Sequence, residues 1–78
     1  MGQALGRKLR ELRCVRNLTV EEASRGVNGG VSVRCLRNAE DGLVGLPPVE
    51  LYLLAELYCG GKGPVMALFD ELVRLNRS

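Results

Sequence analysis

The sequence predicts an all-α fold, a compact domain of five helices. Apolar residues recur three and four positions apart in several segments, which is the period of an amphipathic helix. Stretches containing glycine or proline separate these segments. Of the 78 residues, 46% are apolar but only 4% are aromatic, so aliphatic side chains must form the core. We expect a single domain over residues 1–78, near the lower size limit for a self-sufficient core.

The first helix is expected to be amphipathic and basic, and to end near Asn17. Its apolar stripe consists of aliphatic side chains at helical spacing: Leu5, Leu9, Leu12 and Val15. Basic side chains lie between them: Arg7, Lys8, Arg10 and Arg13. One side of this helix should therefore pack into the core while the other carries positive charge.

Residues 18–42 predict two short helices joined by a tight turn. Thr19 is a good N-cap and Glu22 follows three residues later, which is the pattern of a capping box. The second helix should cover about residues 21–25 and bury Val20 and Ala23. A turn should follow at residues that reach backbone conformations avoided by others: Gly26, Asn28, Gly29 and Gly30.

The third helix should be capped by Ser32, cover about residues 33–41 and stop at Gly42. We expect it to bury Ala39 together with either Cys35 or Leu36. Two short helices with a tight turn between them, here at about residues 19–41, are typical of a helix-turn-helix. The second helix of that motif can lie in the DNA major groove.

Residues 43–48 cannot form a regular helix, because Gly45 and the Pro47-Pro48 pair interrupt it. Pro47 or Pro48 should begin a fourth helix. Its apolar stripe is made of five residues: Val49, Leu51, Leu54, Ala55 and Tyr58. Three glycines should end this helix: Gly60, Gly61 and Gly63.

The fifth helix is predicted at residues 64–76, with Pro64 in its first turn. Its apolar residues cover more than one side: Val65, Leu68, Phe69, Leu72, Val73 and Leu75. One side can close the core, and the surplus predicts a homodimer interface made by Val65, Phe69, Leu72 and Val73. The alternative is a helix that lies deeper in its own core.

The net charge of +2 conceals an uneven distribution. Residues 1–38 contain eight basic and three acidic residues, a balance of +5, whereas residues 39–78 contain three basic and six acidic residues, a balance of −3. This asymmetry favours a basic surface that meets a polyanion. An ordinary solvated helix surface is the alternative.

Several function classes find no support in the sequence. There is no histidine and no nucleophile beside a base, and the adjacent acids Glu21-Glu22 and Glu40-Asp41 should fan outward from their helices, so we predict no enzyme and no cofactor. Three widely spaced cysteines without histidine predict reduced thiols, not a disulfide framework or a zinc site. No apolar run is long enough to span a membrane, and a cytoplasmic, nucleoid-associated protein is expected.

DNA binding requires cations for phosphates and polar side chains for base edges, and both kinds are present. Candidate base readers lie at the start and outer side of the third helix: Ser32, Val33, Arg34, Arg37 and Asn38. Candidate phosphate contacts are four basic side chains and the start of the second helix: Arg7, Lys8, Arg16, Arg25 and Thr19. For each arginine, a plain solvent-facing role is the alternative.

The order of these motifs resembles the Cro/C1-type helix-turn-helix domains of the xenobiotic-response-element family. The first helix matches an L-x-x-x-L-R-x-L-R pattern at Leu5, Leu9, Arg10, Leu12 and Arg13. Glu40 and Gly42 match the E-x-G that ends the third helix, and the fourth helix matches at Leu51, Leu54, Ala55 and Tyr58. Two features are most similar to the N-terminal domains of BldD-like actinomycete regulators. They are the turn before the third helix, which is longer than usual in this family, and the AELY segment.

This resemblance covers about residues 5–72 and implies a lambda-repressor-like fold. It also implies a dimeric transcriptional regulator, here predicted to be a repressor, that binds double-stranded DNA at a pseudopalindromic operator. A second hypothesis is a protein-interaction module, antitoxin-like or regulator-binding, that uses Leu43, Val44, Leu46 and the fifth helix. The apolar loop at residues 43–46 favours this alternative, because phosphate contacts would be expected there.

Overall fold

The computed structural model describes residues 3–60 and 63–77, and these residues form five helices and no strand. The all-α prediction is confirmed. In chain order the helices are α1 (Gln3–Val15), α2 (Val20–Gly26), α3 (Val33–Glu40), α4 (Pro48–Cys59) and α5 (Val65–Arg77). Their ends agree with the predicted ones to within about two residues. The predicted glycine break after α4 included Gly61, which lies outside the described residues.

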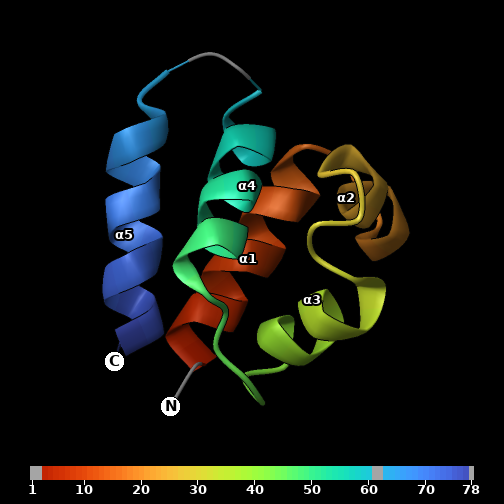
Figure 1. Cartoon of the computed structure of the whole chain (residues 1–78), viewed down its shortest axis with the longest axis horizontal. Coiled ribbons are helices and arrows are strands. Elements are labelled where there is room, and N and C mark those ends of the chain that lie inside the picture. Colours follow the sequence, from red (N-terminus) through yellow and green to blue (C-terminus); the bar gives the residue numbers. More distant parts are fainter. Residues whose placement is uncertain (1–2, 61–62, 78) are drawn as a thin grey trace.

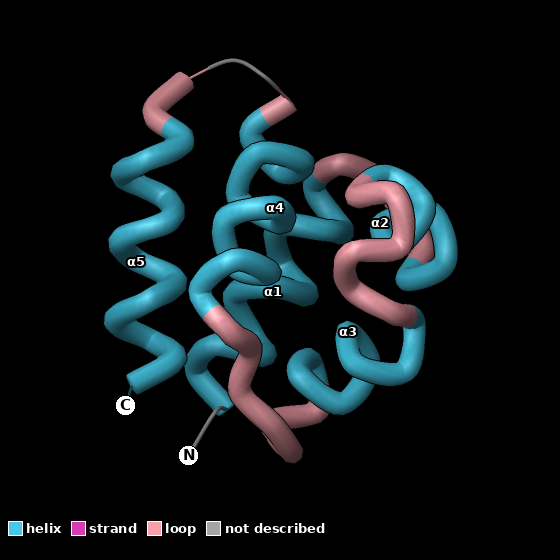
Figure 2. Tube along the Cα trace, viewed as in Figure 1, coloured by secondary structure: helices cyan, strands magenta, loops and turns pink. Residues whose placement is uncertain are grey.

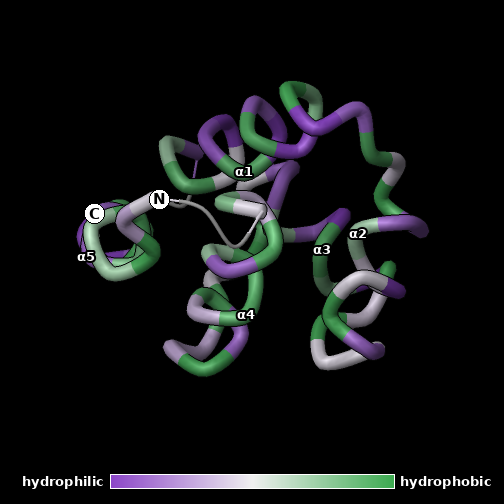
Figure 3. Tube along the Cα trace, turned by 90° about the horizontal axis from the view of Figure 1, so that it is seen from above, coloured by the Kyte–Doolittle hydropathy of each residue, from purple (hydrophilic) through white to green (hydrophobic). Residues whose placement is uncertain are grey.

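The helices divide the molecule into two sides. α5 packs against α4 and α1 at one edge, and α2 and α3 lie at the opposite edge (Figure 1). Seen from above, α5 stands end-on beside α4, and α1 shows the alternation of hydrophobic and hydrophilic segments expected of an amphipathic helix (Figure 3). Figure 2 shows the compact loop that connects α2 to α3. The candidate DNA-binding segment and the candidate dimer helix are therefore on different sides of the molecule.

The core is aliphatic, as the composition predicts. Its largest fully buried side chains come from α1, α3, α4, α5 and the loop before α3: Leu5, Leu9, Val31, Leu36, Leu51, Leu54 and Leu72. Of the two alternatives predicted for α3, Leu36 is buried and Cys35 is exposed. Burial of this apolar surface is the main force that holds the short helices together.

α1 and α3 cross at Gly6, where the two backbones are very close. A Cβ atom at this position would lie 2.5 Å from the carbonyl oxygens of both Ala39 and Glu40. Backbone atoms cannot move aside cheaply, so only glycine permits this approach. The position of α3 on the core therefore depends on a residue of α1 that has no side chain.

Two residues of the predicted apolar stripes are exposed, and their assignment to the core is wrong. Val15 is 75% exposed because it ends α1, beyond the part that other helices cover. Val49 is 72% exposed because it lies about 200° around α4 from Leu51, at 100° per residue, and thus on the opposite side.

The loop between α3 and α4 is fixed by a residue near the end of α5. Asn76 Oδ1 accepts a hydrogen bond from the Leu46 N–H at 3.1 Å, and Asn76 Nδ2 donates one to the Leu46 carbonyl oxygen at 3.0 Å. Leu46 itself is buried, so it cannot contact a partner protein as predicted. Leu43 and Val44 do remain exposed. No described helix is both long and apolar enough to span a bilayer.

Candidate nucleic-acid interface

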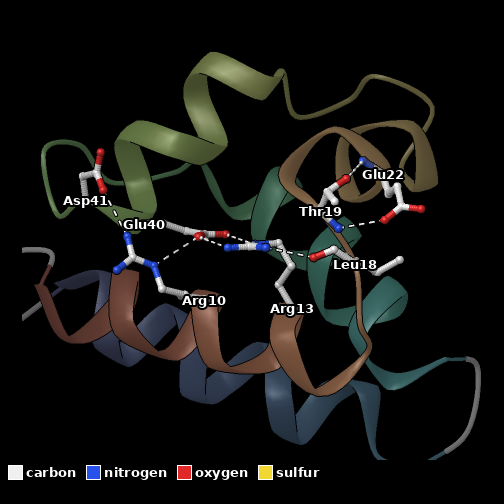
Figure 4. Close-up of polar contacts among 7 residues, drawn as sticks. All are labelled: Arg10, Arg13, Leu18, Thr19, Glu22, Glu40 and Asp41. Atoms are coloured by element: carbon white, nitrogen blue, oxygen red, sulfur yellow. Dashed lines mark hydrogen bonds and ion pairs between the residues drawn. The ribbon is translucent and has the colours of Figure 1, made fainter.

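α2 begins with the predicted capping box. The Thr19 hydroxyl accepts a hydrogen bond from the Glu22 N–H at 3.0 Å, and the Glu22 carboxylate accepts one from the Thr19 N–H at 2.9 Å (Figure 4). The Thr19 N–H is the main reason that the pKa of Glu22 lies below its ordinary value. The Thr19 N–H, at the helix start where a phosphate contact is predicted, is thus already bound by the Glu22 carboxylate.

The turn between α2 and α3 has a defined shape. Asn28 and Gly29 adopt left-handed conformations, with φ of 55° and 76°, which asparagine and glycine tolerate better than other residues. The Ser24 hydroxyl donates a buried hydrogen bond to the Val31 carbonyl oxygen at 2.7 Å. This bond joins α2 to the residue that precedes the cap of α3, so it fixes the direction in which α3 leaves the turn.

α3 starts at the predicted cap and has two distinct sides. The Ser32 hydroxyl accepts a hydrogen bond from the Cys35 N–H at 3.1 Å. The inner side consists of Leu36, Ala39 and Glu40, all buried. The candidate base readers lie along the rest of the helix: Ser32, Arg34 and Arg37 are exposed, and Val33 and Asn38 are half-buried.

The two arginines of this outer side differ in their contacts. Arg37 Nη2 donates to the Glu21 carboxylate on α2 at 2.6 Å, and both side chains are more than half exposed. The Arg34 side chain forms no ion pair or hydrogen bond within residues 3–60 and 63–77. Its guanidinium is therefore free to contact another molecule, whereas that of Arg37 already has an anionic partner.

A second ion pair joins the inner side of α3 to α1. Arg13 donates to both carboxylate oxygens of Glu40, at 2.8 and 2.9 Å, and its remaining terminal nitrogen donates to the Leu18 carbonyl oxygen at 2.8 Å (Figure 4). The Glu40 side chain is only 3% exposed. Its hydrogen bonds to Arg13 raise the pKa of that guanidinium above its ordinary value. This is a bidentate, largely desolvated pair, which is a strong form of Arg–carboxylate contact.

The neighbouring acid, Asp41, pairs with Arg10 at 3.0 Å, and Arg10 also lies 3.5 Å from Glu40 (Figure 4). The prediction that Glu40 and Asp41 both point outward is wrong for Glu40. It follows Leu36 by four residues, a spacing that places it on the buried side of α3. The spacing of Glu40 from Leu36 was the feature of the sequence that could have indicated a buried carboxylate. Because two arginines of α1 pair with these acids, the end of α3 presents little free negative charge.

The basic residues predicted to contact phosphates differ in their exposure and in their partners. Arg7 and Arg25 are exposed and form no ion pair within the described part of the chain. Arg7 lines an open hollow of about 310 Å³ beside the end of α3. Lys8 instead pairs with Glu71 of α5 at 3.7 Å, and the guanidinium of Arg16 lies against Gly60 at the end of α4. The geometry thus brings Arg7, but not Lys8, toward α3.

Comparison with known proteins identifies no family for this chain. No protein-family model, curated protein or solved structure matches this chain.

A buried tyrosine lies near the inner ion pair. Tyr58 of α4 is 5% exposed, and its hydroxyl has no hydrogen-bond partner among the described residues. Burial raises the pKa of this hydroxyl well above its ordinary value, and the nearby Glu40 carboxylate raises it further. The hydroxyl contributes no contact that holds the site together.

The predicted dimer residues of α5 divide into two groups. Leu72 is fully buried against the helices of its own chain, so its assignment to a subunit interface is wrong. Val65, Phe69 and Val73 are half-buried and keep some exposed surface. The Phe69 ring packs edge-on against Tyr52 of α4, with ring centroids 5.5 Å apart.

Proposed function

We propose that residues 19–41 form a helix-turn-helix and that the chain is a sequence-specific DNA-binding transcriptional regulator with a lambda-repressor-like fold. α3 would lie in the major groove of double-stranded DNA. One observation carries this proposal. α3 is anchored on its inner side by Leu36, Ala39 and the Arg13–Glu40 pair, while its outer side offers an unpaired Arg34. A rigid helix with a free guanidinium is what bidentate contact to guanine requires.

The surrounding charges support the same orientation. Arg7, beside the end of α3, and Arg25, in the last turn of α2, are exposed and available to phosphates, which supply most of the non-specific affinity for DNA. Asn38 at the outer side of α3 can contact adenine. In this proposal a homodimer, paired through the exposed parts of Val65, Phe69 and Val73, acts as a repressor on the nucleoid and places two α3 helices on two half-sites.

The experiment is selection of binding sites from a randomised duplex pool, followed by affinity measurements with Arg34→Ala. We expect the selected duplex to bind Arg34→Ala at least five-fold more weakly, because a bidentate contact to guanine discriminates by about 1–3 kcal/mol. Arg77→Ala removes the same charge from the end of α5 and should leave affinity within about two-fold. Absence of any enriched sequence, or equal losses in both variants, would contradict the proposal.

The second candidate is a protein-interaction module, favoured by the exposure of Leu43 at 72% and Val44 at 42% on a loop held by Asn76. Large apolar side chains on a fixed loop are typical of a protein contact. This candidate predicts a stoichiometric protein complex that Leu43→Asp abolishes. It also predicts that the parent protein ignores duplex DNA at low salt, which separates it from the first proposal.

A further inference from the structure

The ion pair between Glu21 and Arg37 connects the first turn of α2 to the edge of α3. The 2.6 Å contact uses a single guanidinium nitrogen, Nη2, and both side chains are more than half exposed to solvent. Glu22, the other acid of that turn, directs its carboxylate back to the Thr19 N–H. Glu21 is therefore the acid of α2 that is free to hold a cation of α3.

This pair cancels charge at the place where the proposed interface needs it. DNA affinity grows with each cation that reaches a phosphate. While Arg37 stays on Glu21, the two side chains together contribute no net charge. Moving Arg37 to DNA would also uncover the Glu21 carboxylate beside the phosphates. Arg34, with no partner in the described residues, has neither restriction.

We infer that Glu21 is an intramolecular competitor of DNA for Arg37, an inference that rests on the proposed DNA-binding function. Arg37 leaves Glu21 only where DNA offers a better acceptor, such as the paired O6 and N7 acceptors of a guanine. Elsewhere the pair persists and Arg37 adds nothing to binding. Glu21 thus lowers affinity for DNA of arbitrary sequence through a side chain that itself reads no base.

The test measures binding to a fluorescent random-sequence duplex over a salt series for the parent, Glu21→Gln, Arg37→Gln and the double variant. Glu21→Gln should raise affinity, and the gain should be up to about five-fold larger with Arg37 present than with Arg37→Gln, because exposed pairs of this kind contribute up to that factor. Freed Arg37 should also steepen the slope of log affinity against log salt by about 0.9. Glu11→Gln, an equal charge change on α1, controls for net charge.

Each outcome has a distinct meaning. A parent that does not bind the duplex at low salt overturns the proposed function and this inference with it. A parent that binds, with equal effects of Glu21→Gln and Glu11→Gln, overturns the inference alone. An equal gain with and without Arg37 also overturns it, because Glu21 would then act only as a negative charge. Circular dichroism of each variant checks that the exposed substitutions leave the helices intact.

Discussion

The Arg13–Glu40 and Arg37–Glu21 pairs each join α3 to a neighbouring helix, and the two pairs differ mainly in burial. On the inner side, Arg13 holds Glu40 through two hydrogen bonds of 2.8 and 2.9 Å, and the Glu40 side chain is 3% exposed. On the outer side, Arg37 holds Glu21 through one contact of 2.6 Å, and the Glu21 side chain is 53% exposed. The chemical groups are the same in both pairs.

Burial gives these pairs different roles. Water and salt screen the outer pair, so its two ions can separate at little cost and take other partners. The inner pair is shielded from water, and removing one partner leaves a charge in a poorly solvated site. The inner pair therefore holds α3 in place, and the outer pair is available for exchange.

The largest effect is expected from Glu40→Ala. It leaves the Arg13 guanidinium without its bidentate partner, which should lower the free energy of unfolding by about 3 kcal/mol or more. This is much of the stability that a domain of this size has. Glu21→Ala is the matched change in the outer pair and should cost no more than about 1 kcal/mol. Urea unfolding of both variants measures the difference, and similar losses would refute the distinction between the pairs.

The second largest change in the free energy of unfolding is expected from Gly6→Ala. Helix propensity alone predicts that alanine stabilises α1 by about 0.5–1 kcal/mol. The close carbonyl oxygens of α3 predict the opposite sign, a loss of about 1–3 kcal/mol, because the added methyl group overpacks against backbone. At Gly26 a Cβ would meet the flexible side chain of Leu57, so Gly26→Ala should cost less. A stabilised Gly6→Ala protein would show that α1 and α3 are not held this closely.

Thr19→Ala removes a contact outside the α1–α3 junction. It deletes the hydroxyl that accepts from the Glu22 N–H, and loss of an N-cap typically lowers stability by about 1 kcal/mol. Thr19→Ser keeps the hydroxyl and serves as the control. Thermal unfolding of the two variants should separate them, and equal midpoints would mean that the cap does not stabilise α2.

The smallest effect is expected from Tyr58→Phe, beside the inner pair. Its hydroxyl is buried without a partner, so removing it should leave stability unchanged or raise it by up to about 1 kcal/mol. Because the raised pKa keeps the folded tyrosine neutral at a pH where the unfolded one ionises, the free energy of unfolding of the parent should fall as pH rises above the unfolded pKa of 10.0. Tyr58→Phe should therefore lose less stability than the parent in alkaline solution. A clear loss at neutral pH would reveal an interaction of the hydroxyl.

Local chemistry made much of the fold predictable. Thr19 with Glu22, and Ser32 before α3, mark the helix starts because a cap involves residues only three apart. Gly45 and the two prolines mark the break before α4 for a similar reason. Apolar residues at helical spacing located α1, α4 and α5, although helical period alone did not reveal that Val15 and Val49 lie where no neighbour covers them.

Contacts between distant residues were harder to predict. The Arg13–Glu40 pair joins positions 27 residues apart, and the Asn76–Leu46 hydrogen bonds join positions 30 apart. Nothing near Gly6 in the sequence indicates that α3 crosses there. Glu40 is an instructive intermediate, since its spacing from Leu36 placed it on the buried side, while its charge suggested a solvent-facing residue. In the candidate site, the sequence predicted which kinds of side chain are present but not which residues they contact.

The most direct measurement of the DNA-binding claim is amide NMR of the labelled protein during titration with a short duplex at low salt. DNA binding through α3 predicts that the largest chemical-shift changes fall on α2, the turn and the outer side of α3, including Arg34, and that α5 changes little. Changes concentrated on Leu43, Val44 and α5, or no change at all, would contradict it.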